Sequence, residues 1–73
     1  MSSFEQRINL YIGNKIKQQR IEYKLSLKEV GGYVGVSYQQ LQKYENGQNR
    51  ISAAKLKMIS QALDVPINYF YGS

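Results

Sequence analysis

Apolar residues recur at intervals of three, four or seven positions along the first third of the chain. The residues that follow this spacing are Phe4, Ile8, Tyr11, Ile12, Ile16 and Tyr23. Such spacing places side chains on one face of an α-helix, so the pattern predicts a helix over residues 4–23. We expect this face to pack into the core of a small domain.

Three further helices are predicted, each preceded by a serine that suits the N-cap position. They span residues 27–34 after Ser26, 38–46 after Ser37 and 53–63 after Ser52. Residues that interrupt a helix follow each of them: Gly35, Asn46-Gly47 and Asp64-Val65. Pro66 suits the first position of a short fifth helix ending in Tyr69-Phe70-Tyr71. The pattern therefore predicts an all-α, five-helix, single domain over residues 1–73, in which residues 1–11 extend the first helix.

The pair Gly31-Gly32 conflicts with the helix predicted over residues 27–34. Each glycine costs a helix about 1 kcal/mol relative to alanine. The missing side chain of Gly31 would let another helix approach closely. Gly32 has no equally good explanation in the sequence. Glu29, by contrast, lies three residues after Ser26 and completes a capping-box pattern.

Composition excludes several classes of function. The chain has no Cys and no His, which removes disulfides, thiolate metal sites and the imidazole of a Ser-His-Asp relay. Its five carboxyl groups form no recognisable pocket motif, so we expect no enzyme and no cofactor, and no small-molecule site is evident. There is neither a signal-peptide core nor a run of about 18 apolar residues, so we expect no membrane segment and a cytoplasmic, nucleoid-associated location in a bacterium or phage.

The net charge of +5 points to an anionic partner such as nucleic acid. The surplus is uneven along the chain. Residues 1–25 hold five basic and two acidic side chains, residues 26–51 three and two, and residues 52–73 two and one. Most of the excess charge therefore lies on the first helix, and charge alone does not identify the partner.

Residues 27–46, with the sequence LKEVGGYVGVSYQQLQKYEN, indicate two helices joined by a turn centred on a glycine. Gly31 is the small residue within the pair and Gly35 allows the turn. Apolar residues that would lock the pair against the rest of the domain are Val30, Val34, Val36, Leu41 and Tyr44. This arrangement is typical of a helix-turn-helix, whose second helix can enter the major groove of DNA.

From about Ile12 to Tyr71 the chain resembles the lambda-repressor-like, Cro/Xre-type helix-turn-helix regulators. The resemblance rests on four segments in the family's order: IGNKIKQQR, residues 27–46, YENGQNRIS and LKMISQALDVPINYFY. It implies a transcriptional regulator, expected to be a repressor, that binds double-stranded DNA in a sequence-specific manner. Because one recognition helix reads only a few base pairs, we also expect a homodimer on two half-sites.

The resemblance implies a role for individual residues. Those expected to read bases are Ser37, Tyr38, Gln39, Gln42 and Lys43. Their chemistry fits, since Gln can pair with adenine and Lys can donate to guanine. Those expected to contact phosphates are Asn46, Gln48, Asn49 and Arg50, with exposed backbone amides around Gly47 as helpers. Looser candidates for phosphate contact are Lys28, Lys17 and Lys15. Arg20 and Glu45 are expected to form a structural ion pair that orients the recognition helix.

Three positions depart from the family pattern. Leu27 replaces the glutamine that usually contacts phosphate at the start of the second helix. Lys24 replaces the glycine that commonly follows the first helix, which leaves the geometry of that turn open. Tyr38 replaces a glutamine that reads adenine in several phage members. The base preferences of the family are therefore not carried over.

Other readings remain beside this one. The same fold could serve as a protein-interaction module, such as an antitoxin or adaptor.

The aromatic cluster of Tyr69, Phe70 and Tyr71 could stack on bases, although we expect Phe70 to pack in the core and the tyrosines to border a dimer contact. The tyrosines expected to pack in the core are Tyr11, Tyr23, Tyr33 and Tyr44, with Tyr44 the most buried. The basic first helix could lie on a membrane surface, but its apolar face is needed for the core.

Overall fold

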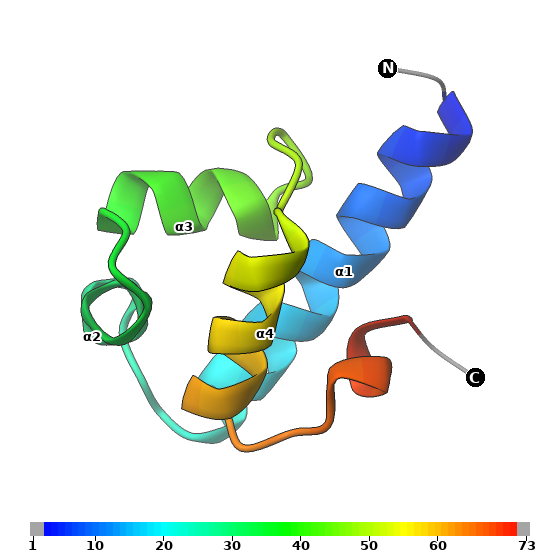
Figure 1. The fold of residues 1–73 in the computed structure, drawn as a ribbon. Helices are drawn as coiled ribbons and strands as arrows, with labels where there is room; N and C mark the ends of the chain where they lie inside the picture. Colours follow the sequence, from blue (N-terminus) through cyan, green and yellow to red (C-terminus); the bar gives the residue numbers. More distant parts are fainter. Residues whose placement is uncertain (1–2, 72–73) are drawn as a thin grey trace.

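The structure is a computed structural model that describes residues 3–71. It contains four α-helices and a closing 3₁₀-helix: α1 Ser3–Glu22, α2 Leu27–Val34, α3 Tyr38–Glu45, α4 Ala53–Ala62 and η1 Ile67–Tyr71 (Figure 1). Residues 3–71 include no strand, so the all-α class predicted from the sequence is confirmed. Observed and predicted helix ends differ by one residue at most.

The fifth predicted helix differs from the observed element. Residues Ile67–Tyr71 form a 3₁₀-helix, and Pro66 precedes it instead of opening it. The amide of Tyr69 donates to the carbonyl of Pro66 at 3.0 Å, a spacing of three residues. The 3₁₀ geometry suits such a short connecting piece. It brings the Phe70 ring fully into the core.

The three predicted serine caps are all present. Each hydroxyl accepts a hydrogen bond from the amide three residues later: Ser26 from Glu29 at 3.0 Å, Ser37 from Gln40 at 3.1 Å and Ser52 from Lys55 at 3.1 Å. The carboxylate of Glu29 also accepts from the Ser26 amide at 2.9 Å, which completes the capping box. These local bonds explain why the short helices begin where the sequence predicts.

A residue with a left-handed backbone follows every α-helix. These residues are Lys24 with φ 58°, Gly35 with φ 74°, Gly47 with φ 71° and Asp64 with φ 55°. Lys24 therefore adopts the conformation for which the resembled family commonly uses glycine. Across this turn the Leu25 amide donates to the Arg20 carbonyl at 3.0 Å, as in a Schellman motif. The turn after α1 keeps its geometry without a glycine.

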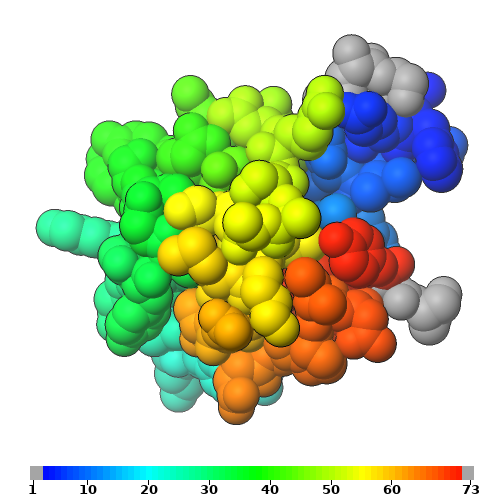
Figure 2. Space-filling view, viewed as in Figure 1, coloured from blue at the N-terminus to red at the C-terminus, as the bar shows by residue number. Residues whose placement is uncertain are grey.

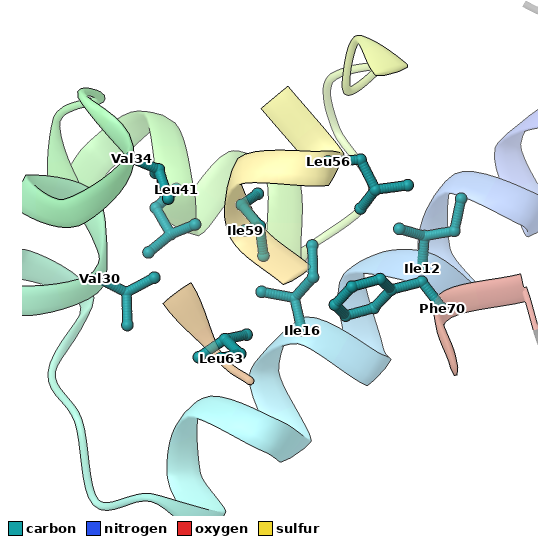
Figure 3. Packing of buried hydrophobic residues seen from close by; sticks show 9 residues of the cluster. All are labelled: Ile12, Ile16, Val30, Val34, Leu41, Leu56, Ile59, Leu63 and Phe70. Carbon is teal, nitrogen blue, oxygen red and sulfur yellow. The ribbon is translucent and has the colours of Figure 1, made fainter. Parts of the chain in front are cut away.

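One apolar core joins all five elements. Its buried members are Ile12, Ile16, Val30, Val34, Leu41, Leu56, Ile59, Leu63 and Phe70. Figure 3 shows Phe70 beside Ile12 and Ile16, so η1 covers the middle of α1. The helix-turn-helix contributes Val30, Val34 and Leu41, as the motif predicts. The core thus fixes α3 relative to α1 and α4.

The apolar face predicted for α1 is only partly buried. Ile12 and Ile16 are buried, but Phe4 is 65% exposed and Ile8 40% exposed. Tyr11, Tyr23 and Tyr33 are also exposed, so the prediction that they pack in the core is wrong. Tyr44 is half-buried and packs against the core, as does Tyr69. The described elements cover only the middle of α1, and the remainder of its apolar face lies at the surface.

Gly31 is required for a reason different from the predicted one. A Cβ atom at Gly31 would lie 2.7 Å from the carbonyl oxygen of Val36, so the segment that approaches is the turn and not another helix. A Cβ atom at Gly32 would meet nothing within 4 Å. The structure does not explain Gly32.

Candidate nucleic-acid interface

The inner side of α3 is fixed by close contact with α1. Leu41 and Glu45 are buried on this side. A Cβ atom at Gly13 of α1 would lie 2.3 Å from the carbonyl oxygen of Tyr44, closer than real Cβ contacts allow. The two backbones therefore meet directly, and only glycine fits at this position. This contact determines which side of α3 faces outward.

Arg20 and Glu45, the pair that the resemblance implied, are joined by two hydrogen bonds. Arg20 Nε donates to Glu45 Oε2 at 2.7 Å, and Nη2 donates to Oε1 at 3.1 Å. The third guanidinium nitrogen, Nη1, donates to the Leu25 carbonyl at 2.8 Å. Arg20 and Glu45 side chains are only 12% and 3% exposed. One guanidinium thus ties α1 and the turn after it to the end of α3.

The residues expected to read bases lie together on the outer side of α3. Ser37, Tyr38, Gln39, Gln42 and Lys43 are all exposed. Positions 38, 39, 42 and 43 share one face of the helix, because four residues make roughly one turn. The Ser37 hydroxyl accepts the capping bond from Gln40, which leaves its proton able to donate outward. Donors and acceptors suited to base edges are therefore gathered along the outer face of α3.

The loop after α3 presents the residues expected to contact phosphate. Asn46, Gln48 and Arg50 are exposed, and Asn49 is half-buried. Two of the backbone amides around Gly47 already have partners within the protein. The Gly47 amide donates to the Tyr44 carbonyl at 3.1 Å, and the Gln48 amide donates to the Lys43 carbonyl at 2.9 Å. Because these bonds close α3, both amides are already occupied within the protein.

Gly47 packs the loop against the N-terminal half of α1. A Cβ atom at Gly47 would lie 2.9 Å from Leu10 Cα, so backbone meets backbone here as it does at Gly13. Near this contact, Arg50 Nη2 lies 3.3 Å from Glu5 Oε2. Glu5 was not predicted at this site, because nothing in the local sequence pattern links residues 45 positions apart.

The lysines expected to contact phosphate are spread over separate elements. Lys28 is exposed in the first turn of α2, and Lys17 is exposed on α1. Lys15 is half-buried, and its ammonium lies 5.5 Å from the Tyr11 ring centre and 5.1 Å from that of Tyr69. This cation–π position places Lys15 on the side of α1 that faces η1. The expected lysines therefore come from α1 and α2, not from α3.

Lys55 has a structural role that the sequence did not reveal. Its ammonium donates to the Val34 carbonyl at 2.7 Å, at the end of α2. A cation at this position satisfies a free carbonyl and interacts favourably with the helix dipole. This bond ties the helix-turn-helix to α4.

Within residues 3–71, no group of His, Cys, Asp and Glu side chains could hold a metal ion. None of the helices in the same part of the chain is long and apolar enough to cross a membrane.

Comparison with known proteins places this geometry in a family. The helix-turn-helix family HTH_3 matches residues 16–70. An uncharacterised transcriptional regulator in the ATPase CF(0) region of Rhodospirillum rubrum is 44% identical over 88% of this chain and 59% of its own length. The chain spans about half the length of the curated relatives it matches.

Solved structures share the fold. An HTH_3 family transcriptional regulator from Vibrio cholerae has a TM-score of 0.83 and 27% identity, over 92% of this chain and 38% of its own. The restriction-modification controller protein C.AhdI from Aeromonas hydrophila has a TM-score of 0.81 over 85% of this chain and 94% of its own, and its 19% identity shows the fold alone. Residues 16–70, which match the HTH_3 family, include α2, α3 and the loop after α3. These elements together carry most of the candidate interface. This chain belongs to the HTH_3 family of helix-turn-helix proteins, whose matching relatives are named transcriptional regulators.

Proposed function

We propose that this chain binds double-stranded DNA in a sequence-specific manner and regulates transcription, as a repressor. The outer face of α3 enters the major groove and reads bases through Tyr38, Gln39, Gln42 and Lys43. Residues of the following loop, above all Arg50, neutralise phosphates and hold the register. A repressor needs no further activity, since occupying an operator is enough to exclude other proteins.

One observation carries this proposal. The outer face of α3 is polar and exposed, while its inner face is fixed by Gly13, Leu41 and the buried pair of Arg20 and Glu45. A helix held this firmly presents side chains in one geometry, which base recognition requires. A solvated helix face with no binding role has no need of such a clamp.

The first test is fluorescence anisotropy with duplex DNA over a series of salt concentrations. Phosphate contacts release counterions, so the logarithm of the affinity should fall linearly with the logarithm of the salt concentration, by about 0.9 per contacted phosphate. Selection of bound sites from a random duplex library then supplies the operator. Binding that is absent, or that does not respond to salt, would contradict the proposal.

Two substitutions separate the proposed roles. Gln39→Ala removes a base contact, so it should reduce the preference for the selected operator by about 1 to 3 kcal/mol while retaining non-specific binding. Arg50→Ala removes a phosphate contact and should weaken all duplexes by the same factor. Equal behaviour of the two variants would show that the roles are wrongly assigned.

The proposal includes a homodimer. Half-sites about one helical turn apart, roughly 34–36 Å, would then place two copies of α3 in successive major grooves. We assign the contact between copies to the exposed aromatic and aliphatic side chains of Phe4, Ile8, Tyr11 and Tyr71. They border an open groove of about 580 Å³ between α1 and η1. Sedimentation of the wild type and of Phe4→Ser, with and without DNA, tests this assignment, because loss of the apolar contact should weaken self-association.

Binding to a protein through α3 is the competing function. Only Tyr38 is a large hydrophobic residue on the exposed side of α3, whereas a protein-binding helix would present several apolar anchors. Loss of DNA binding with retained capture of a protein by α3 would favour the competing function.

We further propose that the chain acts at the bacterial nucleoid in the cytoplasm and catalyses no reaction.

A further inference from the structure

The first turns of α1 lie against the loop that carries the proposed phosphate contacts. Glu5 and Arg50 face each other there at 3.3 Å, and Leu10 contacts Gly47. Figure 2 shows the N-terminal part of α1 and the loop after α3 adjoining at the surface. The family match begins at residue 16, so Glu5 lies outside the segment that the family shares.

The two charged groups of this pair differ in their freedom. The Arg50 side chain is 74% exposed and Glu5 only 39%, and the Oε2 atom of Glu5 is shielded from solvent. Glu5 belongs to the first turns of α1, so its carboxylate stays with the protein. Arg50 lies in the loop and has room to reach outward. The pair therefore joins a partly shielded anion to a cation that is open to a second anion.

We propose that Glu5 competes with DNA phosphate for Arg50 and so limits the affinity of this chain for any duplex. The inference rests on the proposed DNA binding. A guanidinium pairs with a carboxylate and with a phosphate through the same donors, so Arg50 must leave or share Glu5 when it contacts DNA. The carboxylate also repels a phosphate that approaches Arg50.

The effect of this competition on affinity does not depend on the DNA sequence. Arg50 contacts the backbone in the proposed complex, so Glu5 lowers the affinity for operator and non-operator DNA by the same factor. Base reading by α3 is untouched. Glu5 thus acts as a positioning residue for Arg50, and it sets how strongly the chain is held on DNA in general.

The test compares Glu5→Gln with Glu22→Gln by anisotropy on one duplex over a salt series. Both variants lose one negative charge from α1. Glu22 lies 17 residues further along the helix, about 25 Å away, which is roughly three Debye lengths at 0.15 M salt. Glu5→Gln should tighten binding about twofold to fivefold, the size of one exposed ion pair, and should steepen the salt dependence by up to about 0.9. Glu22→Gln should match the wild type.

A double-mutant cycle with Arg50→Gln shows whether the effect passes through Arg50. In the Arg50→Gln background, adding Glu5→Gln should give a clearly smaller gain, because only the direct repulsion between Glu5 and phosphate is then relieved. A gain of equal size there, or binding by Glu5→Gln no tighter than the wild type, overturns the inference. Glu5→Ala repeats the measurement with a second side chain, and melting curves show that the variants are folded. If the wild type binds no duplex, both the proposed function and this inference are refuted. If the wild type binds DNA and Glu5→Gln binds no more tightly, only the inference is refuted.

Discussion

The two ends of α1 carry the same kinds of residue with opposite results. From Ile12 to Ile16 the helix buries its apolar side chains and approaches α3 through Gly13. Before that point Phe4 and Ile8 continue the same helical spacing but remain exposed. Regular apolar spacing therefore identifies a helix and one of its faces, but it does not show how much of that face has a neighbour.

The two ion pairs near the ends of α1 also differ in how much of each pair is exposed to solvent. Arg20 and Glu45 are nearly enclosed and joined at 2.7 Å, and their pair orients α3. Arg50 is largely exposed and Glu5 partly exposed, and the two meet at 3.3 Å. Exposed pairs stabilise a fold by about 0 to 1 kcal/mol, whereas breaking a buried pair costs about 3 to 5 kcal/mol. The inner end of α1 thus secures the fold, and the outer end is free to serve binding.

The strongest test of this contrast is Gly13→Ala. A Cβ atom at Gly13 would meet the backbone of Tyr44 and Glu45 within 2.8 Å, and backbone atoms cannot turn aside. We expect a loss of about 4 kcal/mol in the free energy of unfolding, measured by urea denaturation. The control is Gly32→Ala in α2, where space is open and alanine should stabilise by up to about 1 kcal/mol. Similar losses from both variants would contradict the close contact.

Arg20→Ala should have the next largest effect. The carboxylate of Glu45 would remain buried without its partner, and the Leu25 carbonyl would lose its donor. We expect a loss of about 3 kcal/mol by the same measurement. Arg50→Ala is the matched change in the exposed pair and should cost under about 1 kcal/mol. A costly Arg50→Ala would show that the outer pair also supports the fold.

Ile16→Ala and Ile8→Ala make the same truncation at a buried and at an exposed position of α1. Ile16 is fully buried, so its truncation should cost about 2 to 3 kcal/mol, partly through the cavity left behind. Ile8 is 40% exposed and should cost under about 1 kcal/mol in the isolated protomer. A larger loss at Ile8 that grows with protein concentration would instead report the proposed contact between copies.

Local signals in the sequence were sufficient for the helices and their ends. Ser26, Ser37 and Ser52 cap helices through bonds that span three residues, and Gly35 and Gly47 end them through their own backbone freedom. These effects act within one turn of chain, so they can be read without knowing the fold. The exposed, polar outer face of α3 also followed from the helix-turn-helix pattern.

Only the tertiary structure decided which surfaces meet. The burial of α1 depends on where η1 and α3 lie, and the use of the Gly47 and Gln48 amides depends on how α3 closes. The approach of Glu5 to Arg50 joins two elements far apart in the chain, and no periodicity encodes such a distance. The sequence by itself therefore determined the helices, their caps and the helix-turn-helix, because those depend on neighbouring residues. The fixed inner face of α3 and the pair beside the proposed DNA contact depend on packing between helices, which the chain acquires only when folded.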